Sequence, residues 1–311
     1  MSRAVVATAY GGPEVLSLTD VDPGEPGPGE VLLEVRAAGV NPIDWKTYTG
    51  TFGTDLSRLP LRLGQEAAGV VQQVGPDAEP WVPGDEVIAF RAPGAYADRL
   101  IVRATELVPK PPKLSWAKSS ALLLSGVTAM HAVVATRIGV GDTVLVHGAA
   151  GGVGSMVVQI ARARGARVIG TASPANHEYL VDIGAIPVVY GPGLAARVRA
   201  IARTEVHAAI DTVGTNEALD TSVALVTDRQ RVATIAGFAH GAVLHVNVLG
   251  TRPGTDPGTD IRFAARRKLV DLVNAGKVDV RIATTYRLAD VARAHRTGIA
   301  GRADGKMALL P

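Results

Sequence analysis

The chain has 311 residues, of which 47% are hydrophobic and 20% charged, and its 32 basic and 29 acidic side chains leave a net charge of +3. This composition is that of a globular protein large enough for two domains, and it excludes a mainly disordered chain. Cysteine is absent, no apolar stretch approaches the roughly 18 residues of a spanning helix, and the basic residues are interleaved with alanine and acidic residues. We therefore expect a cytoplasmic protein without disulfides that binds neither membranes nor nucleic acid.

The segment up to about residue 113 is expected to be rich in β-strands. Its clearest strands are 31–35, 69–74 and 86–90, and turns rich in glycine and proline, such as 23–29 and 83–85, separate them. Turns at such short intervals suit antiparallel strands and leave little room for helices. This part is therefore predicted to form an antiparallel β domain.

From residue 115 onward the pattern changes to alternating helices and strands, which predicts an α/β fold with a doubly wound parallel sheet. The apolar strand 143–147 leads into the glycine-rich turn 148–154, and a helix is expected over 155–164. This order directs the free N–H groups of a helix N-terminus toward a pyrophosphate.

The glycine turn departs from the usual dinucleotide fingerprint, because Ala149 replaces its first glycine. The following strand, 167–171, returns at the distance expected for a βαβ unit, which strengthens the prediction. We expect contacts with a dinucleotide from Ala150, Gly151, Gly152, Val153 and Gly154.

The residue after the second strand of this unit indicates which dinucleotide is favoured. An acidic side chain there binds both ribose hydroxyls of NAD and repels the 2′-phosphate of NADP. Ser173 occupies the position, and its hydroxyl can donate a hydrogen bond to that phosphate. His177, which follows closely, is either a cofactor contact or a surface residue. NADPH is therefore the expected cofactor.

Four segments, 39–44, 64–71, 125–129 and 149–154, resemble in order the motifs of the medium-chain dehydrogenase/reductase (MDR) superfamily. The resemblance covers nearly the whole chain and is greatest to the zinc-free NADPH:quinone oxidoreductases, the zeta-crystallin-like branch. It implies a GroES-like β-rich catalytic domain, a Rossmann domain that binds NADP(H), and a homodimer.

The domain boundaries follow from this resemblance. We expect the GroES-like catalytic domain at residues 1–123 and 250–311, and the Rossmann NADP(H)-binding domain at 124–249. The turn-rich segment 251–259 would connect the two.

Zinc-dependent members of the superfamily use a cysteine and a histidine at two of these motifs. This chain has Asn41 and Gln65 there, and Ala121 falls about where a further ligand is expected. Amides are poor zinc ligands, so no metal is expected. Without one, the acceptor must take hydride readily, as quinones and activated alkenes do.

The resemblance also implies cofactor contacts outside the glycine turn. Asn41 would lie beside the nicotinamide ribose, Thr128 on the nicotinamide side, and the loop from Ile235 to Gly237 along the ring. Arg302 would reach the 2′-phosphate, and Tyr190 is a weaker candidate because its segment is about one residue short. Structural roles remain open for each, such as a turn for Asn41 and a solvated charge for Arg302.

The catalytic candidates are Asn41, Lys46 and Tyr48. Lys46 and Tyr48 are possible proton donors or substrate contacts, although both could instead lie on the surface of a loop. Phe52 stands at about the position where similar enoyl thioester reductases carry a tyrosine that donates a proton, which weakens that assignment.

Three functions remain open at this point. The first is a zinc-independent quinone reductase that transfers hydride from NADPH. The second is an NADPH-dependent reductase of enones or alkenals at the same site. The third is a non-enzymatic NADPH-binding protein, because a fold does not fix a function.

Overall fold

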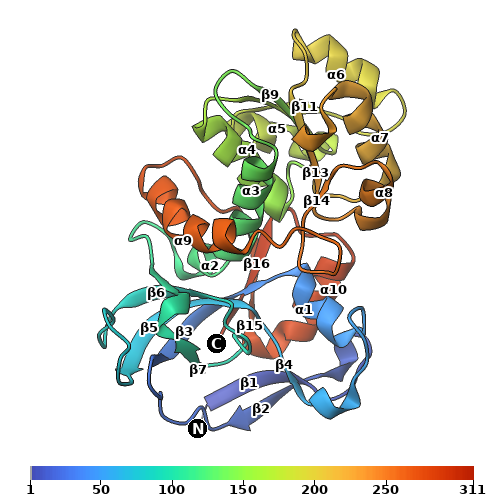
Figure 1. Cartoon of the computed structure of the whole chain (residues 1–311). Coiled ribbons are helices and arrows are strands. Elements are labelled where there is room, and N and C mark those ends of the chain that lie inside the picture. Colours follow the sequence, from blue (N-terminus) through green and yellow to red (C-terminus); the bar gives the residue numbers. More distant parts are fainter. Residues whose placement is uncertain (1) are drawn as a thin grey trace. The chain divides into compact units, whose positions relative to one another are not determined.

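The computed structural model describes residues 2–311, which divide into two compact units (Figure 1). The first unit extends to Leu124 and is completed by Val280–Pro311, and the second comprises Ser125–Asp279. The second boundary therefore lies after Asp279, and not after residue 249 as the sequence had indicated. Helix α9 (Thr259–Asn274) accounts for the difference, because its Leu269 is fully buried against Gly126 of the second unit.

Among residues 2–124 and 280–311, the first unit contains ten strands and short helices. The strands are β1 (Ser2–Ala7), β2 (Leu16–Val21), β3 (Glu30–Val40), β4 (Leu61–Arg62), β5 (Glu66–Val74), β6 (Glu86–Phe90), β7 (Arg99–Arg103), β8 (Leu107–Pro109), β15 (Ile282–Arg287) and β16 (Lys306–Leu310). The α-helices are α1 (Pro42–Tyr48), α2 (Trp116–Ser119) and α10 (Val291–Ile299). One-turn 3₁₀ helices lie at Pro13–Val15, Leu56–Arg58, Ala104–Glu106 and Leu288–Asp290.

The main sheet of this unit has the strand order β15-β16-β3-β5-β6-β8, with β7 paired to β3, and a smaller sheet has the order β2-β1-β4. All pairs in these sheets are antiparallel except β15 with β16. Val31, Leu33 and Val35 of β3 alternate along the strand and belong to the buried core. The predicted β-rich domain is confirmed.

The second unit alternates strands and helices. Its strands are β9 (Thr143–His147), β10 (Arg167–Thr171), β11 (Ala185–Val188), β12 (Ala208–Asp211), β13 (Val232–Thr234) and β14 (Asn247–Val248). Its helices, besides α9 and most of α3 (Leu123–Ala135), are α4 (Gly152–Ala163), α5 (His177–Asp182), α6 (Leu194–Ala202), α7 (Asn216–Leu225) and α8 (Phe238–Val243). One-turn 3₁₀ helices lie at Pro174–Asn176 and Arg229–Arg231.

The sheet of the second unit has the order β11-β10-β9-β12-β13-β14, and every neighbouring pair is parallel. Strand β9 is buried along its whole length, as expected for a central strand of a parallel sheet covered on both faces. Leu145 and Ile169 of the sheet share one hydrophobic cluster with Leu194 and Val198 of α6 and with Leu219 of α7. The expected Rossmann-type parallel sheet is confirmed.

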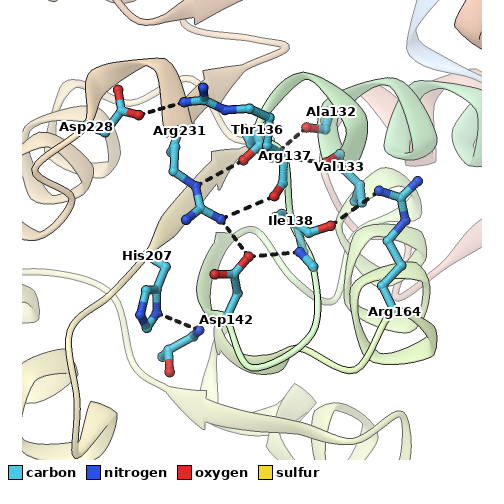
Figure 2. A network of polar contacts seen from close by, with 12 residues as sticks. Ala132, Val133, Thr136, Arg137, Ile138, Asp142, Arg164, His207, Asp228 and Arg231 are labelled. Carbon is cyan, nitrogen blue, oxygen red and sulfur yellow. Dashed lines mark hydrogen bonds and ion pairs between the residues drawn. The ribbon is translucent and has the colours of Figure 1, made fainter.

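A polar network joins α3 to the amino-terminal end of this sheet (Figure 2). Arg231 donates to Asp142 Oδ2 at 2.6 Å and to the carbonyl oxygens of Thr136 and Arg137, both at 3.3 Å. The first amide of β9 donates to Nδ1 of His207 at 2.9 Å. These contacts fix one end of β9, while its other end leads into the glycine turn.

Candidate functional site

A cavity of about 410 Å³ lies in the second unit where strands β9, β10 and β12 end. Its volume is within the range of small-molecule sites, and the carboxyl ends of parallel strands are where α/β sheets bind ligands. The lining residues are His147, Gly148, Ala150, Gly151, Thr171, Ala172, Ser173, Asn176, Tyr190, Leu194, Val213, Thr215, Glu217 and Ala218.

The glycine turn brings the start of α4 to this cavity. Gly151 is the N-cap of α4 and provides no side-chain cap, so the first N–H groups of this 12-residue helix have no partner within it. A Cβ atom at Gly154 would lie 2.1 Å from the carbonyl oxygen of Gly148, so only glycine permits this close approach. Of the predicted residues, Ala150 and Gly151 line the cavity, and the first turn of α4 contains Gly152, Val153 and Gly154. The arrangement fits an anionic pyrophosphate.

Two of the residues predicted on the ribose side line the cavity. Ser173 follows β10, and Nδ2 of Asn176 lies 3.5 Å from its hydroxyl oxygen. Tyr190 also lines the cavity and is 56% exposed. His177 is not a lining residue, and its Nε2 lies 3.4 Å from the carbonyl oxygen of Ala172 instead.

The charge of the lining bears on the choice of cofactor. The lining residues described above include one carboxylate, that of the exposed Glu217, and neither lysine nor arginine. Arg302, the predicted partner of a 2′-phosphate, lies in the first unit and is exposed in the turn before β16. The second unit therefore provides a hydroxyl and backbone amides for a phosphate, while a cationic partner must come from outside this lining.

His147, which no sequence motif singled out, lies at the end of β9 in the cavity wall. Its Nε2 is 3.0 Å from the hydroxyl oxygen of Ser222, and that hydroxyl donates to the carbonyl oxygen of Ala218 at 2.8 Å. Burial lowers the pKa of His147 to about 4, against the charge of Asp211, which raises it. The imidazole is therefore neutral at pH 7 and donates to Ser222.

The loop predicted to line the nicotinamide is held by two buried polar side chains. Thr234 Oγ1 donates to Asp211 Oδ2 at 2.7 Å and accepts from the amide of Gly237 at 2.8 Å. Ile235, partly buried, donates its amide to the carbonyl oxygen of Asp211 at 3.1 Å. Thr128 is partly buried in α3. The structure thus places Ile235 and Gly237 in a loop of the second unit that Thr234 and Asp211 hold by hydrogen bonds.

Asn41 is buried in the first unit at the N-cap of α1. Its Nδ2 donates to Glu66 Oε1 at 2.9 Å, and its Oδ1 accepts from Nζ of Lys306. Lys306 also lies 3.6 Å from Glu66 and donates to the carbonyl oxygen of Val40 at 3.2 Å. Glu66 and Lys306 are partners that sequence reasoning missed, and they engage both ends of the Asn41 amide.

Tyr48 and Lys46, on the same helix, have different surroundings. Lys46 is exposed, whereas Tyr48 is fully buried, so the alternative of a surface loop is wrong for Tyr48. The hydroxyl of Tyr48 lies 2.9 Å from Nδ1 of His295 in α10, and the two rings stack. The exposed Phe52 lies beyond the end of α1.

His295 connects Tyr48 to a second buried tyrosine and a buried carboxyl group. Its Nε2 lies 3.3 Å from the hydroxyl oxygen of Tyr96, and Tyr96 donates to Asp44 Oδ2 at 2.7 Å. The same carboxylate oxygen accepts from the backbone amide of Asn41 at 2.8 Å. All four side chains are at most 1% exposed.

Burial shifts the pKa values of this group. It raises the pKa of Asp44 to about 7, although the hydrogen bonds from Tyr96 and Asn41 and the charge of Lys306 act to lower it. Burial also lowers the pKa of His295 to about 4. At pH 7 the imidazole is therefore neutral. The Asp44 carboxyl group changes between its protonated and ionised forms near the same pH.

No three histidine, cysteine, aspartate or glutamate side chains among residues 2–311 are grouped so as to hold a metal ion. Likewise, none of the helices in this range combines the length and apolar character that a bilayer crossing requires.

Segments of both units match the models of known protein families. Residues 27–112 match the family model of the alcohol dehydrogenase GroES-like domain, and residues 152–257 match that of the zinc-binding dehydrogenases. The chain is 34% identical over 331 aligned positions to a quinone oxidoreductase of Pseudomonas aeruginosa, and 32% identical to one of Salmonella typhimurium. Each alignment covers 100% of both chains.

Solved structures show the same similarity. A mycobacterial protein in complex with NADPH superposes with a TM-score of 0.86 at 31% identity, covering 100% of both chains. An NAD-dependent alcohol dehydrogenase superposes with a TM-score of 0.87 at 28% identity, covering 99% of both chains.

Proposed function

The chain belongs to the quinone oxidoreductase branch of the MDR superfamily, and we propose that it is a zinc-independent reductase that uses NADPH to reduce quinones. The observation that carries the proposal is the cavity at the ends of β9, β10 and β12, bordered by the glycine turn and the first turn of α4. Together with the relatives, it supports an oxidoreductase that binds a nicotinamide cofactor.

The residues present fit such a cofactor. The first amides of α4 and the backbone of Ala150 and Gly151 would hold the pyrophosphate, and Ser173 would face the ribose. Glycine at position 154 permits the close packing of turn and helix. When bound, the cofactor supplies a hydride to the acceptor. The protein's part is to orient both reactants and to exclude water.

Zinc independence rests on the side chains at the ligand positions. Asn41 and Gln65 replace the cysteine and histidine of zinc-dependent members, and amides are poor zinc ligands. The Asn41 amide is already engaged by Glu66 and Lys306. We therefore propose that acceptors are substrates that need no Lewis acid.

The preference for NADPH is proposed from Ser173 and Arg302. A serine leaves room for a 2′-phosphate where an acidic residue would repel it. The guanidinium of Arg302 suits a phosphate dianion. Tyr190 is a further proposed contact at the same cavity.

The test is oxidation of NADPH and NADH by the purified protein in EDTA, against a panel of quinones and α,β-unsaturated carbonyls. Turnover in EDTA that prefers NADPH and quinones supports the proposal. Preference for alkenes over quinones would identify the chain as an enone or alkenal reductase. Tight NADPH binding without turnover of any acceptor would identify a binding protein and reject the enzyme.

We also propose a homodimer, as in the family. Strand β14 forms an edge of the parallel sheet, and Val243, just before it, is 72% exposed. Sedimentation equilibrium of the wild type and of Val243→Asp tests this. A dimeric wild type and a monomeric variant are expected, and a monomeric wild type would reject the proposal.

A further inference from the structure

One segment that borders the cavity of the second unit belongs to neither a helix nor a strand. Residues 189–193 connect β11 to α6, and Tyr190 in this segment lines the cavity with a side chain that is 56% exposed. Gly191 and Gly193 have φ angles of +99° and +81°, a left-handed conformation that glycine adopts freely. A connecting segment with two such glycines is expected to move unless other contacts hold it.

The side chain of Arg197, in α6, makes such contacts with the carbonyl oxygens of the segment. Its Nε and Nη2 donate to Val189 at 3.2 and 2.9 Å. Nη2 also donates to Gly191 at 2.8 Å, and Nη1 donates to Pro192 at 2.7 Å. The three acceptors lie on both sides of Tyr190 along the chain. All four bonds go to backbone oxygens, so they fix the course of the backbone at this residue.

This arrangement depends on the shape of the guanidinium and on a fixed helix behind it. A guanidinium presents its N–H donors as a rigid planar fork, whereas lysine carries the same charge on one nitrogen. Hydrogen bonds from a charged donor are also stronger than those between neutral groups. Leu194 and Val198 hold α6 in the hydrophobic cluster of the sheet, independently of Arg197. Arg197 therefore joins the mobile type of segment to a helix that the core already fixes.

We propose that Arg197 is a positioning residue for the cofactor, because it holds segment 189–193 so that Tyr190 lines the cavity before any ligand arrives. This inference rests on the proposed binding of NADPH at this cavity. An aromatic ring that is fixed in advance offers the cofactor an apolar face without a further loss of freedom on binding. If the segment is released, Tyr190 is in place in only a fraction of the molecules, and the apparent affinity falls by that fraction.

The test compares Arg197→Met with Arg199→Met, two substitutions in the same helix that each remove one positive charge. Methionine at position 197 keeps an unbranched apolar stem and removes the donors. Arg199 is the matched control, because it is exposed and donates to the carbonyl oxygen of Ala224 at 3.2 Å, and Ala224 does not line the cavity. Arg197→Lys keeps the charge without the fork, and it carries the test if the methionine variant does not fold.

Three measurements separate a role toward the cofactor from a merely structural one. Hydrogen–deuterium exchange of the ligand-free protein reports the mobility of the segment without any cofactor. Fluorescence titration gives the dissociation constant of NADPH for each variant, for Tyr190→Ala and for the double variant of Arg197→Met and Tyr190→Ala. This double-mutant cycle distinguishes an effect that acts through Tyr190 from a direct one. Steady-state rates give kcat and KM for NADPH.

In Arg197→Met, exchange within segment 189–193 should be at least about 10-fold faster, and the dissociation constant of NADPH about 10-fold higher. KM for NADPH should rise with it while kcat stays within about 2-fold, since binding is weakened alike in the ground and transition states. Arg197→Lys should still bind NADPH at least about 3-fold more weakly than the wild type. In the Tyr190→Ala background, Arg197→Met should change the dissociation constant by less than about 2-fold. Arg199→Met should match the wild type in every measurement.

Other results would overturn the inference. If Arg197→Met folds and binds NADPH within about 2-fold of the wild type, Arg197 has no positioning role and the proposed function still stands. An equal loss of affinity in the Tyr190→Ala background would show that Arg197 does not act through Tyr190. Full recovery in Arg197→Lys would assign the effect to charge alone. A wild type that binds no NADPH rejects the proposed function and, with it, the role toward the cofactor, whereas the exchange data still show whether Arg197 holds the segment.

Discussion

The cavity of the second unit and the buried polar group of the first are built in different ways. The part of the cavity that binds by backbone is the turn from Gly148 to Gly154, one continuous segment of glycines and amides at the start of α4. The polar group joins Asp44, Tyr96 and His295, which are far apart in the sequence. A site made by backbone can be recognised from a local motif, whereas one made by side chains exists only after folding.

The largest expected effect tests the side-chain site through Asp44→Asn. Burial raises the pKa of Asp44 from 3.8 to about 7, so folding favours the protonated carboxyl group. The stabilisation from this group is full below about pH 4 and is lost as the pH rises to 7, which lowers the free energy of unfolding of the wild type by roughly 4 kcal/mol. Asparagine does not titrate. In urea unfolding, the free energy of unfolding of the variant relative to that of the wild type should therefore rise by the same amount between pH 4 and pH 7.

Asp142→Asn is the matched control. Burial acts to raise the pKa of Asp142, but the hydrogen bonds from Arg231 and Gly139 together lower it, so this carboxylate is ionised from about pH 5 upward in both the folded and unfolded states. Its difference from the wild type should therefore stay constant between pH 5 and pH 8. A constant difference for Asp44→Asn as well would contradict the pKa of Asp44.

A second prediction tests the backbone site with Gly154→Ala. The added Cβ would lie 2.1 Å from the carbonyl oxygen of Gly148, so the turn or α4 must move. Overpacking of this kind costs about 1–3 kcal/mol of stability, and displaced amides should also weaken NADPH binding. Thermal unfolding and fluorescence titration with NADPH would measure both effects.

Gly151→Ala provides the comparison within the same turn, because its Cβ would lie 3.3 Å from the same oxygen and the residue is exposed. A smaller loss of stability is expected. Equal losses in the two variants would mean that close packing at position 154 is not what restricts the turn.

A third prediction asks whether the first unit contributes to cofactor choice. If Arg302 binds the 2′-phosphate, Arg302→Ala should weaken NADPH binding by about 1.5–3 kcal/mol, the range for a hydrogen bond to a charged group, and leave NADH nearly unchanged. The measurement is the dissociation constant of each cofactor for the wild type and for Arg302→Ala. Equal losses for NADPH and NADH would reject the role of Arg302.

The smallest expected effect concerns Glu217, the carboxylate in the cavity lining. It is exposed and screened by solvent, so Glu217→Gln should strengthen NADPH binding relative to NADH by at most about 1 kcal/mol. Glu205→Gln makes the same change of charge outside the lining and should leave the ratio of the two affinities unchanged. If both variants shift the ratio alike, the effect is one of net charge and not of the cavity.

Much of the fold could be predicted from the sequence. The β-rich first part and the parallel sheet of the second follow from apolar periodicity and from the placement of glycine and proline, which act over a few residues. The second domain boundary could not, because the apolar face of α9 can cover either unit. Only the packing of Leu269 against Gly126 assigns it to the second.

Part of the candidate site could also be predicted from the sequence. Ser173 and Gly151 lie at the cavity because short loops carry them directly from β10 and β9. The surroundings of Tyr48 were not predictable, because a tyrosine near the end of a short helix suits a surface equally well. It is buried in the core of the first unit, and the partner of its hydroxyl, His295, lies 247 positions further along the chain.

By itself, the sequence determined the βαβ unit and its glycine turn, since helices, strands and turns form from local patterns. Tertiary structure alone decided that Asp44, Tyr96, His295 and Tyr48 make one buried hydrogen-bonded group. The physical reason is that the pKa of a side chain depends on the water removed from around it and on the partners that packing brings to it. Neither quantity is present in the order of residues along the chain.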